Sequence, residues 1–541
     1  MADKVKQPTY RLLCLLSTMA LPVSGLAGEL MIQPALEVLS SHPDIDDRTT
    51  PSQSRDGLAW SLTPELGLEY HSNRTRVNFI TRYQHIERHG ELTSSGRSNG
   101  DWSTTLSSTV DIVKDALQLA ATYDRSQQLA DSRTGVFSDK LTAPDDFVDV
   151  ESYSGNLSWQ IPNAKWVSMN GSLFGSRRTT VDDVSDGDFF NVDSERLGGQ
   201  MQLSNGYQYQ YLQWQLQASE QETRRRQLGD FKQQALSANM DIPLYGELSL
   251  TLTAQDTNYS LDGNQILADR LDYQQYGIGL GWQLGQNSVI KIIAYRSDQN
   301  QEQTDDNYIG GLARLVLSPR SSIEYEKSKN ALGDKESLTL IQNSRLLRTR
   351  VGFSEDIRIS TTTELAQTGT ATFVCSDSST DINDCFLPST LDYQLAPGEA
   401  LVSFNQLSPE LNEQVAKLET AFISLSYDNQ SKLLMSVGYS HSKRVGLESA
   451  TRDEDRDSYS ANLSYRVAPY SAVILSANIS QIDFITLNES DDNRQFALSY
   501  DTALSPDMDL KLSAVRRERK VDERQIDFTD DRLELVLNYR F

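Results

Sequence analysis

Beyond its first residues, the sequence has no long apolar run. Past residue 27, no stretch offers the roughly 18 to 20 uncharged apolar residues that a membrane-spanning helix requires. The mean hydropathy of −0.49 fits a large periplasmic or extracellular β protein. It also fits a membrane barrel, because the lumen and loops of a barrel are polar. The missing run therefore excludes a helical membrane protein and leaves two β-rich alternatives.

Positive charge is scarce as well. The chain carries 50 basic and 75 acidic residues, a formal net charge of −25. Such an excess of acid makes nucleic acid an improbable partner. Outside loops of this charge would repel anionic surface polymers but not neutral glycans or divalent cations. The charge limits the partners without naming one.

Cysteine is nearly absent, with three residues in 541. Cys14 lies in the N-terminal leader, and Leu13 precedes it where a lipoprotein anchor needs a small residue. The other two, Cys375 and Cys385, lie in a polar segment of an exported chain, where a disulfide closing a small loop is the expected state. Metal ligation by two isolated thiols is the alternative.

The first 27 residues have the pattern of a secretory signal peptide. Basic residues precede an apolar run from Leu12 to Ala20, a breaker at Pro22 and a small residue at Ala27, the predicted cleavage position. The segment 1–27 holds three basic residues and one acidic residue, so the mature chain has a net charge of −27. Cleavage also removes Cys14 and leaves residues 28–541, which we predict to form a single domain.

The C-terminal segment carries apolar residues at alternate positions. Polar residues separate Leu533, Leu535, Leu537, Tyr539 and Phe541, with only Val536 breaking the polar set. Such a strand has one apolar and one polar face, which is the pattern of an outer-membrane barrel strand. The terminal aromatics Tyr539 and Phe541 resemble the signal read by the bacterial barrel-assembly machinery. The predicted location is the outer membrane of a Gram-negative bacterium.

The same alternation recurs along the mature chain in segments of about ten residues, the length of a tilted membrane-crossing strand. Short turns rich in Pro, Asn, Asp and Gly alternate with longer connections. The short turns are expected at 72–73, 162–163, 205–206, 243–244, 286–287, 319–320, 428–429, 468–469 and 506–507. The longer connections are expected near 42–56, 89–99, 128–149, 178–190, 299–305, 445–456 and 521–530. We predict an all-β, up-and-down transmembrane barrel of about 24 strands, within 22 to 26, with both chain termini in the periplasm.

The largest insertion spans 367–414. It contains both cysteines and a helix-like piece from Ser408 to Ala416, with Ser408 as N-cap and Pro409 at the first helical position. A loop of this length in a barrel is usually functional. It is expected either to fold into the mouth as a gate or to lie outside as a cap.

Several charged side chains have the parity of the lumen face. Lumen charges of this kind bias which solutes pass, or alternatively neutralise one another and stiffen the wall. The pore-lining candidates are Arg348, Arg350, Lys511, Arg517, Arg532, Glu534 and Arg540.

Motifs for metal binding or catalysis are weak. His85 and His89 are four residues apart, which suits zinc on a helix, but on a strand they lie about 13 Å apart. The acidic stretch from Asp182 to Asp193 resembles a calcium loop, with Val184 at a ligand position and no closing Glu. No G-x-S-x-G elbow is present. We predict no enzymatic activity, no cofactor and no metal site, with a barrel hydrolase as a third alternative.

One hairpin resembles a known group of barrels. The segment Ser337 to Arg345, followed by Arg348 to Asp356 and preceded by Leu317 to Glu326, is similar to a strand, "SR" turn and "Y/F-S-E-D" form. That form occurs in outer-membrane barrels associated with PEP-CTERM and exosortase systems and with exopolysaccharide gene clusters. The resemblance implies a setting near polysaccharide export or surface assembly, and no catalytic residue.

These observations favour a passive outer-membrane channel or translocation pore associated with exopolysaccharide export. The alternative is a structural or adhesive barrel that displays acidic loops to matrix or cations. Expected partners are outer-membrane lipid, lipopolysaccharide and the barrel-assembly machinery, together with polysaccharide and periplasmic export components. Nucleic acid is not expected.

Overall fold

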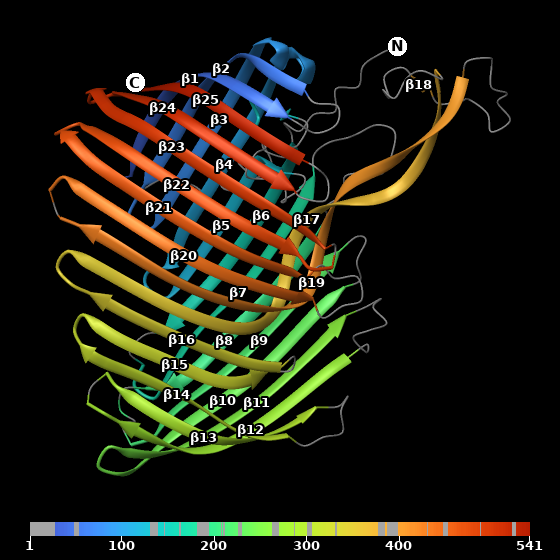
Figure 1. Ribbon diagram of the computed structural model, residues 1–541. Helices are drawn as coiled ribbons and strands as arrows, with labels where there is room; N and C mark the ends of the chain where they lie inside the picture. Colours follow the sequence, from blue (N-terminus) through green and yellow to red (C-terminus); the bar gives the residue numbers. More distant parts are fainter. Residues whose placement is uncertain are drawn as a thin grey trace.

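The chain folds into one closed β-barrel (Figure 1). The computed structural model describes residues 28–47, 53–129, 139–144, 147–161, 164–180, 194–206, 208, 211–225, 230–261, 270–285, 287–299, 306–330, 333–376, 385–386, 399–429, 431–446, 453–486, 488–521 and 526–541. Each barrel strand pairs antiparallel with the next, and β1 pairs with β25 to close the ring. Closure leaves no sheet edge exposed to lipid.

Twenty-four strands form the wall, as predicted, and the two-residue strand β18 lies outside it. The strands are β1 Glu29–Asp47, β2 Gln53–His71, β3 Thr75–Gly90, β4 Ser98–Val113, β5 Leu117–Leu129, β6 Phe147–Ile161, β7 Val167–Thr180, β8 Ser194–Asn205, β9 Gln213–Arg225, β10 Phe231–Tyr245, β11 Leu248–Leu261, β12 Arg270–Gln283, β13 Val289–Gln299, β14 Asp306–Ser318, β15 Ser321–Asn330, β16 Gly333–Asn343, β17 Leu347–Ser376, β18 Cys385–Phe386, β19 Glu399–Asp428, β20 Leu433–Gly446, β21 Glu454–Ala468, β22 Ser471–Phe484, β23 Glu489–Ser505, β24 Met508–Val521 and β25 Ile526–Arg540. A 3-10 helix, η1, spans Glu91–Ser95. Among the described residues, no helix is long and apolar enough to cross a membrane.

The period-two pattern sets which side chains meet lipid. Leu533 on β25 is 65 % exposed and Phe541, which follows the strand, is 72 % exposed, whereas the inward Arg532 is 3 % exposed. The strand register carries this parity from one strand to the next, for example from Leu535 to Leu512 on β24. The outer wall is therefore apolar and the lumen polar, the arrangement of an outer-membrane barrel. The protein is a 24-stranded barrel of the bacterial outer membrane.

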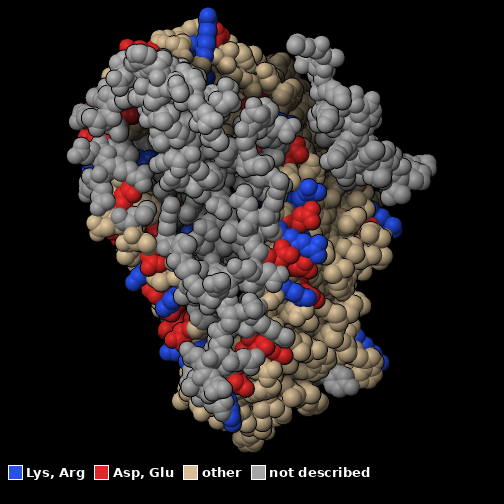
Figure 2. Space-filling model, turned by 90° about the vertical axis from the view of Figure 1, so that its right-hand side faces the viewer, with Lys and Arg blue, Asp and Glu red and all other residues tan. Residues whose placement is uncertain are grey.

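The two ends of the barrel differ in their connections. Short turns close one end, and local hydrogen bonds fix several of them. Asn429 Oδ1, for example, accepts the backbone N–H groups of Ser431, Lys432 and Leu433 at 3.0, 2.9 and 2.9 Å. One turn lies at Gly246, where the φ of 60° suits glycine, three residues beyond its expected position because β10 continues to Tyr245. Figure 2 faces the opposite end, where acidic and basic side chains intermingle around the rim.

The insertion at 367–414 is a hairpin, and the predicted helix at 408–416 is wrong. β17 and β19 each continue for 30 residues and pair from Leu347–Tyr427 to Ser376–Glu399. In Figure 1 this hairpin runs past the rim and away from the barrel. A capping residue followed by proline is a local signal, whereas extension of an existing strand pair satisfies the backbone hydrogen bonds of both chains at once. The pairing therefore overrides the helix signal.

The strand register places the two cysteines of the predicted disulfide opposite each other. Cys375 on β17 lies directly opposite Cys385 on β18 in an antiparallel pair. Opposed residues in such pairs have Cα atoms about 4.5 to 5.5 Å apart, within the range that a disulfide spans. We expect no free thiol in the denatured mature protein before reduction and two after it, as measured by thiol alkylation and mass spectrometry. Cys375→Ser should expose one free thiol without reduction. Two alkylated cysteines in the unreduced protein would contradict the prediction.

The C-terminal aromatic pair lies on the outer face of the closing strand. The rings of Tyr539 and Phe541 pack edge to face with centroids 4.7 Å apart. The backbone N–H of Phe541 donates to the Pro34 carbonyl at 3.0 Å, a bond that does not need the ring. We expect Phe541→Ser to lower the amount of folded barrel in cellular outer membranes and to leave refolding into micelles unchanged. Leu533→Ser, on the same face of the same strand, is the control. Equal cellular yields of the wild type and of both serine variants would contradict the prediction that the C-terminal aromatics are an assembly signal.

The signal peptide at 1–27 and the acidic stretch at 182–193 lie outside the described residues.

Candidate functional site

A short segment between β5 and β6 folds into the lumen at the end with long connections. Asp139–Thr142, here called the inward segment, forms a tight turn in which the N–H of Thr142 donates to the Asp139 carbonyl at 2.9 Å. Asp139 Oδ1 also accepts the N–H of Leu141 at 2.9 Å. Leu141 and Thr142 are each 5 % exposed. The contacts described below join this segment to inward-facing residues of the wall and to η1, so the segment narrows the lumen.

Arg88 on β3 binds the backbone of the inward segment. Its Nη2 donates to the Lys140 carbonyl at 2.5 Å and its Nε to the Leu141 carbonyl at 2.6 Å. Its Nη1 donates to the Gly96 carbonyl at 3.2 Å. Arg88 has no exposed surface, so its guanidinium joins β3, the loop after η1 and the inward segment in a dry environment.

Asp139 meets a buried charge network on the last two strands. Arg532 on β25 donates to Asp139 and to Asp530, and neither the Arg532 nor the Asp530 side chain is exposed. Arg517 on β24 lies 3.7 Å from Asp139 and 3.9 Å from Asp530. Glu534 lies 3.6 Å from Arg532. These pairs attach the tip of the inward segment to the wall by opposite charge, at side chains that are at most one-fifth exposed and therefore little screened by water.

Apolar packing completes the attachment. Leu141 belongs to a buried cluster with Ile45, Ala59, Ile86 and Leu92. The neighbouring Lys140 donates to Asp101 on β4 at 3.0 Å. The inward segment is therefore held by carbonyl hydrogen bonds, ion pairs and buried apolar surface together.

The structure divides the seven pore-lining candidates into two groups. Arg517, Arg532 and Glu534 belong to the network at Asp139, and Arg540 pairs with Asp509 at 2.5 Å on the other rim. The remaining three, Arg348, Arg350 and Lys511, also have lumen parity and are exposed. Among the described residues, no carboxylate lies within ion-pair distance of these three, although Arg350 lies over the Phe422 ring at 5.4 Å.

Sequence patterns missed the partners of this network. The parity of β3 did place Arg88 on the inner face, which was an available signal. Nothing in the sequence placed Asp139 next to β25, almost four hundred residues away. A further inward pair, Arg519 on β24 with Asp491 on β23 at 2.7 Å, was also missed.

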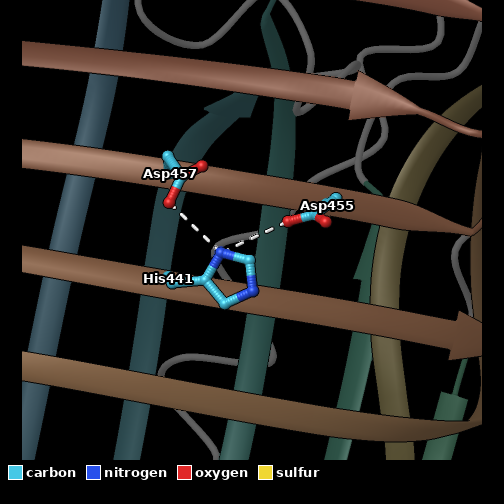
Figure 3. A group of neighbouring side chains, drawn as sticks. All are labelled: His441, Asp455 and Asp457. Atoms are coloured by element: carbon cyan, nitrogen blue, oxygen red, sulfur yellow. Dashed lines mark hydrogen bonds and ion pairs between the residues drawn. The ribbon is translucent and has the colours of Figure 1, made fainter.

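One group of possible metal ligands lies on the outer face (Figure 3). His441 Nδ1 on β20 is 3.1 Å from Asp457 Oδ1 and 3.4 Å from Asp455 Oδ1, both on β21. Among the described residues, this is the one such trio of histidine and carboxylate ligands close enough to share an ion. The Tyr439 hydroxyl donates to Asp457 at 2.7 Å. These hydrogen bonds account for the geometry of the trio, and we assign it no metal.

His85 and His89 lie on β3, as the strand interpretation predicted, and both have outward parity. In the described part of the chain, no serine hydroxyl bonds to the His441 imidazole.

Comparisons with known proteins assign the chain to no family. No protein-family model matches the chain, and no curated protein matches it. Among solved structures, the FrpB iron transporter of Neisseria meningitidis is similar over 94 % of this chain and 81 % of its own, with 9 % identity and a TM-score of 0.48. The siderophore receptor PirA of Acinetobacter baumannii gives 94 % and 80 %, with 8 % identity and a TM-score of 0.38. A variant of the ferric enterobactin receptor PfeA of Pseudomonas aeruginosa gives 94 % and 80 %, with 8 % identity and a TM-score of 0.39.

Proposed function

We propose that this protein is a passive outer-membrane channel whose lumen is narrowed by the inward segment. The observation that carries the proposal is the burial of Arg88 and Arg532 around Asp139–Leu141. Closure of the barrel wall does not require a loop bound inside the lumen. A barrel with more strands than the 16 to 18 of open porins has a wider lumen, which must be partly filled if passage is to be restricted. The inward segment supplies part of that filling.

The exopolysaccharide setting depends on the resemblance of one hairpin alone. The proposal therefore covers a channel for polar solutes in general. Polymer export would be supported if genes for polysaccharide synthesis or export lie beside the gene of this protein.

The unpaired cations of the lumen are proposed to bias ion passage. We expect Arg348→Gln with Arg350→Gln to raise the cation-to-anion permeability ratio several-fold, because two unpaired positive charges leave the lumen. The measurement is the reversal potential across a bilayer that separates two salt concentrations. Arg516→Gln is the matched control, since Arg516 has outward parity and pairs with Glu518 at 2.7 Å. An equal shift in the control would mean that lumen charge does not set selectivity.

Conductance tests the channel itself. The mature chain is refolded into planar bilayers, alone and with 371–404 replaced by a two-residue turn. Because that hairpin runs away from the mouth, we expect both proteins to conduct equally. Conductance only in the protein with the shortened hairpin would show that the hairpin itself closes the channel. Silence of both proteins, with folding shown by heat-dependent gel mobility, would overturn the channel proposal.

A second candidate, a structural or adhesive barrel, is favoured by the projecting hairpin. The paired stretches 366–376 and 399–408 continue past the rim (Figure 1), where they would present a surface to matrix. If this function is correct, we expect no ion conductance in bilayers that contain the protein, and we expect cells that carry the protein with the shortened hairpin to lose adhesion to matrix.

A further inference from the structure

A polar cavity opens in the lumen beside the inward segment. Its volume is about 740 Å³, within the range of small-molecule sites. The inward segment and the start of β6 form one side, through Asp139, Lys140 and Phe147. The other side is the inner face of β21 to β24. That face contributes serines, amides and one arginine: Ser458, Ser460, Ser480, Asn478, Asn493, Gln495 and Arg517.

One of these amides is buried without a partner. Asn493 is 2 % exposed, and neither its Oδ1 nor its Nδ2 has a hydrogen-bond partner among the described residues. The Nε of Arg517 is likewise buried and unpartnered. Burying an unpaired amide carries a free-energy cost of roughly 1–3 kcal/mol, so buried polar groups are normally satisfied. An amide left with both its donor and its acceptor unused, in the wall of a cavity, points to a ligand that fills it.

The charges around the cavity argue against an ionic ligand. Arg517 already faces Asp139 at 3.7 Å and Asp530 at 3.9 Å. Lys140 already donates to Asp101 at 3.0 Å. An anion would have to compete with these carboxylates, and a cation would meet the two basic side chains.

The donor and acceptor inventory indicates the ligand's chemistry. An amide both donates and accepts, and so does a hydroxyl group, so each hydroxyl of a ligand can satisfy both functions of Asn493 or Gln495. The serine hydroxyls can also both donate and accept hydrogen bonds. Phe147 adds an apolar ring to the cavity wall, and Lys140 Nζ lies 5.8 Å from the centroid of that ring.

We propose that this cavity binds a neutral, hydroxyl-rich solute of about disaccharide size. The inference rests on the proposed channel and names the substrate class at the cavity beside the inward segment. The bound solute would sit against the inward segment, between Lys140 and Asn493, on the path from the outside to the lumen.

Calorimetric titration of the mature chain, refolded in micelles, tests the proposal without requiring conduction. The probes are trehalose as a neutral disaccharide, glucuronate as an anion and glucosamine as a cation. We expect saturable binding of trehalose alone. Asn493→Leu should raise its Kd about tenfold or more, since two hydrogen bonds are lost. Gln495→Met, at a less buried position of the same cavity, should raise it to a smaller extent.

Asn170→Leu is the matched control, because Asn170 is an exposed lumen asparagine on β7 outside this cavity. An unchanged trehalose Kd in this variant supports the assignment. Absence of saturable binding with all three probes, preference for glucuronate or glucosamine, or an equal Kd in the Asn493 and Asn170 variants would each overturn it. If the protein binds trehalose but shows no conductance in bilayers, the cavity proposal stands and the channel proposal is wrong.

Discussion

Replacing Arg532 by methionine should lower the free energy of unfolding by about 3–5 kcal/mol. The guanidinium is the partner of Asp530, and neither side chain is exposed. Removing it leaves the buried Asp530 carboxylate with only Arg517, 3.9 Å away, as a counter-charge among the described residues, and releases Asp139 from Arg532. The measurement is urea-induced unfolding of the refolded barrel in lipid vesicles, followed by tryptophan fluorescence.

Arg540→Met is the control for this prediction. Arg540 lies on the same strand and the same face and also pairs with an aspartate, Asp509, but its side chain is 65 % exposed. Exposed pairs contribute about 0–1 kcal/mol, so this variant should remain close to the wild type. Equal losses in the two variants would mean that the buried network is no stronger than a surface ion pair.

The second large effect is expected in conductance, from Arg88→Met. Without the guanidinium, the carbonyls of Lys140, Leu141 and Gly96 lose a buried donor, at a cost of roughly 1–3 kcal/mol for each group left unsatisfied. The inward segment can recover those hydrogen bonds only by moving into water. We therefore expect larger and more variable single-channel currents than in the wild type.

Arg82→Met separates this effect from a general loss of lumen charge. Arg82 lies on the same face of β3 and pairs with Glu65 at 2.5 Å, but its side chain is 52 % exposed. It touches no part of the inward segment among the described contacts. Currents that rise equally in both variants would show that charge, rather than release of the segment, controls passage.

The structure divides the lumen charges that parity alone treats as equivalent. The same alternation puts Arg350 and Arg532 inside. Arg532 is buried among carboxylates, whereas Arg350 is exposed beside an aromatic ring. A structural role fits the first residue and a selectivity role is proposed for the second. The distinction depends on neighbours from β24 and from the loop before β6.

The sequence by itself determined the barrel. Alternating apolar and polar residues fix which face of each strand meets lipid, because a slip of one residue would turn every side chain to the wrong side. Repetition of that pattern between turn residues limited the number of strands to 22 to 26, and the serial hairpins predicted their order. Local signals were weaker guides: the cap and proline at 408–409 predicted a helix where strand pairing continues.

Only the tertiary structure decided what lies inside. Closure of the ring brings β25 beside β1 and places Arg88 and Arg532 on one inner wall. That wall receives Asp139 from a distant loop, and the same loop forms one side of the cavity that contains Asn493. These contacts join residues hundreds of positions apart, and they arise from burial and charge pairing across the lumen, which no local pattern encodes.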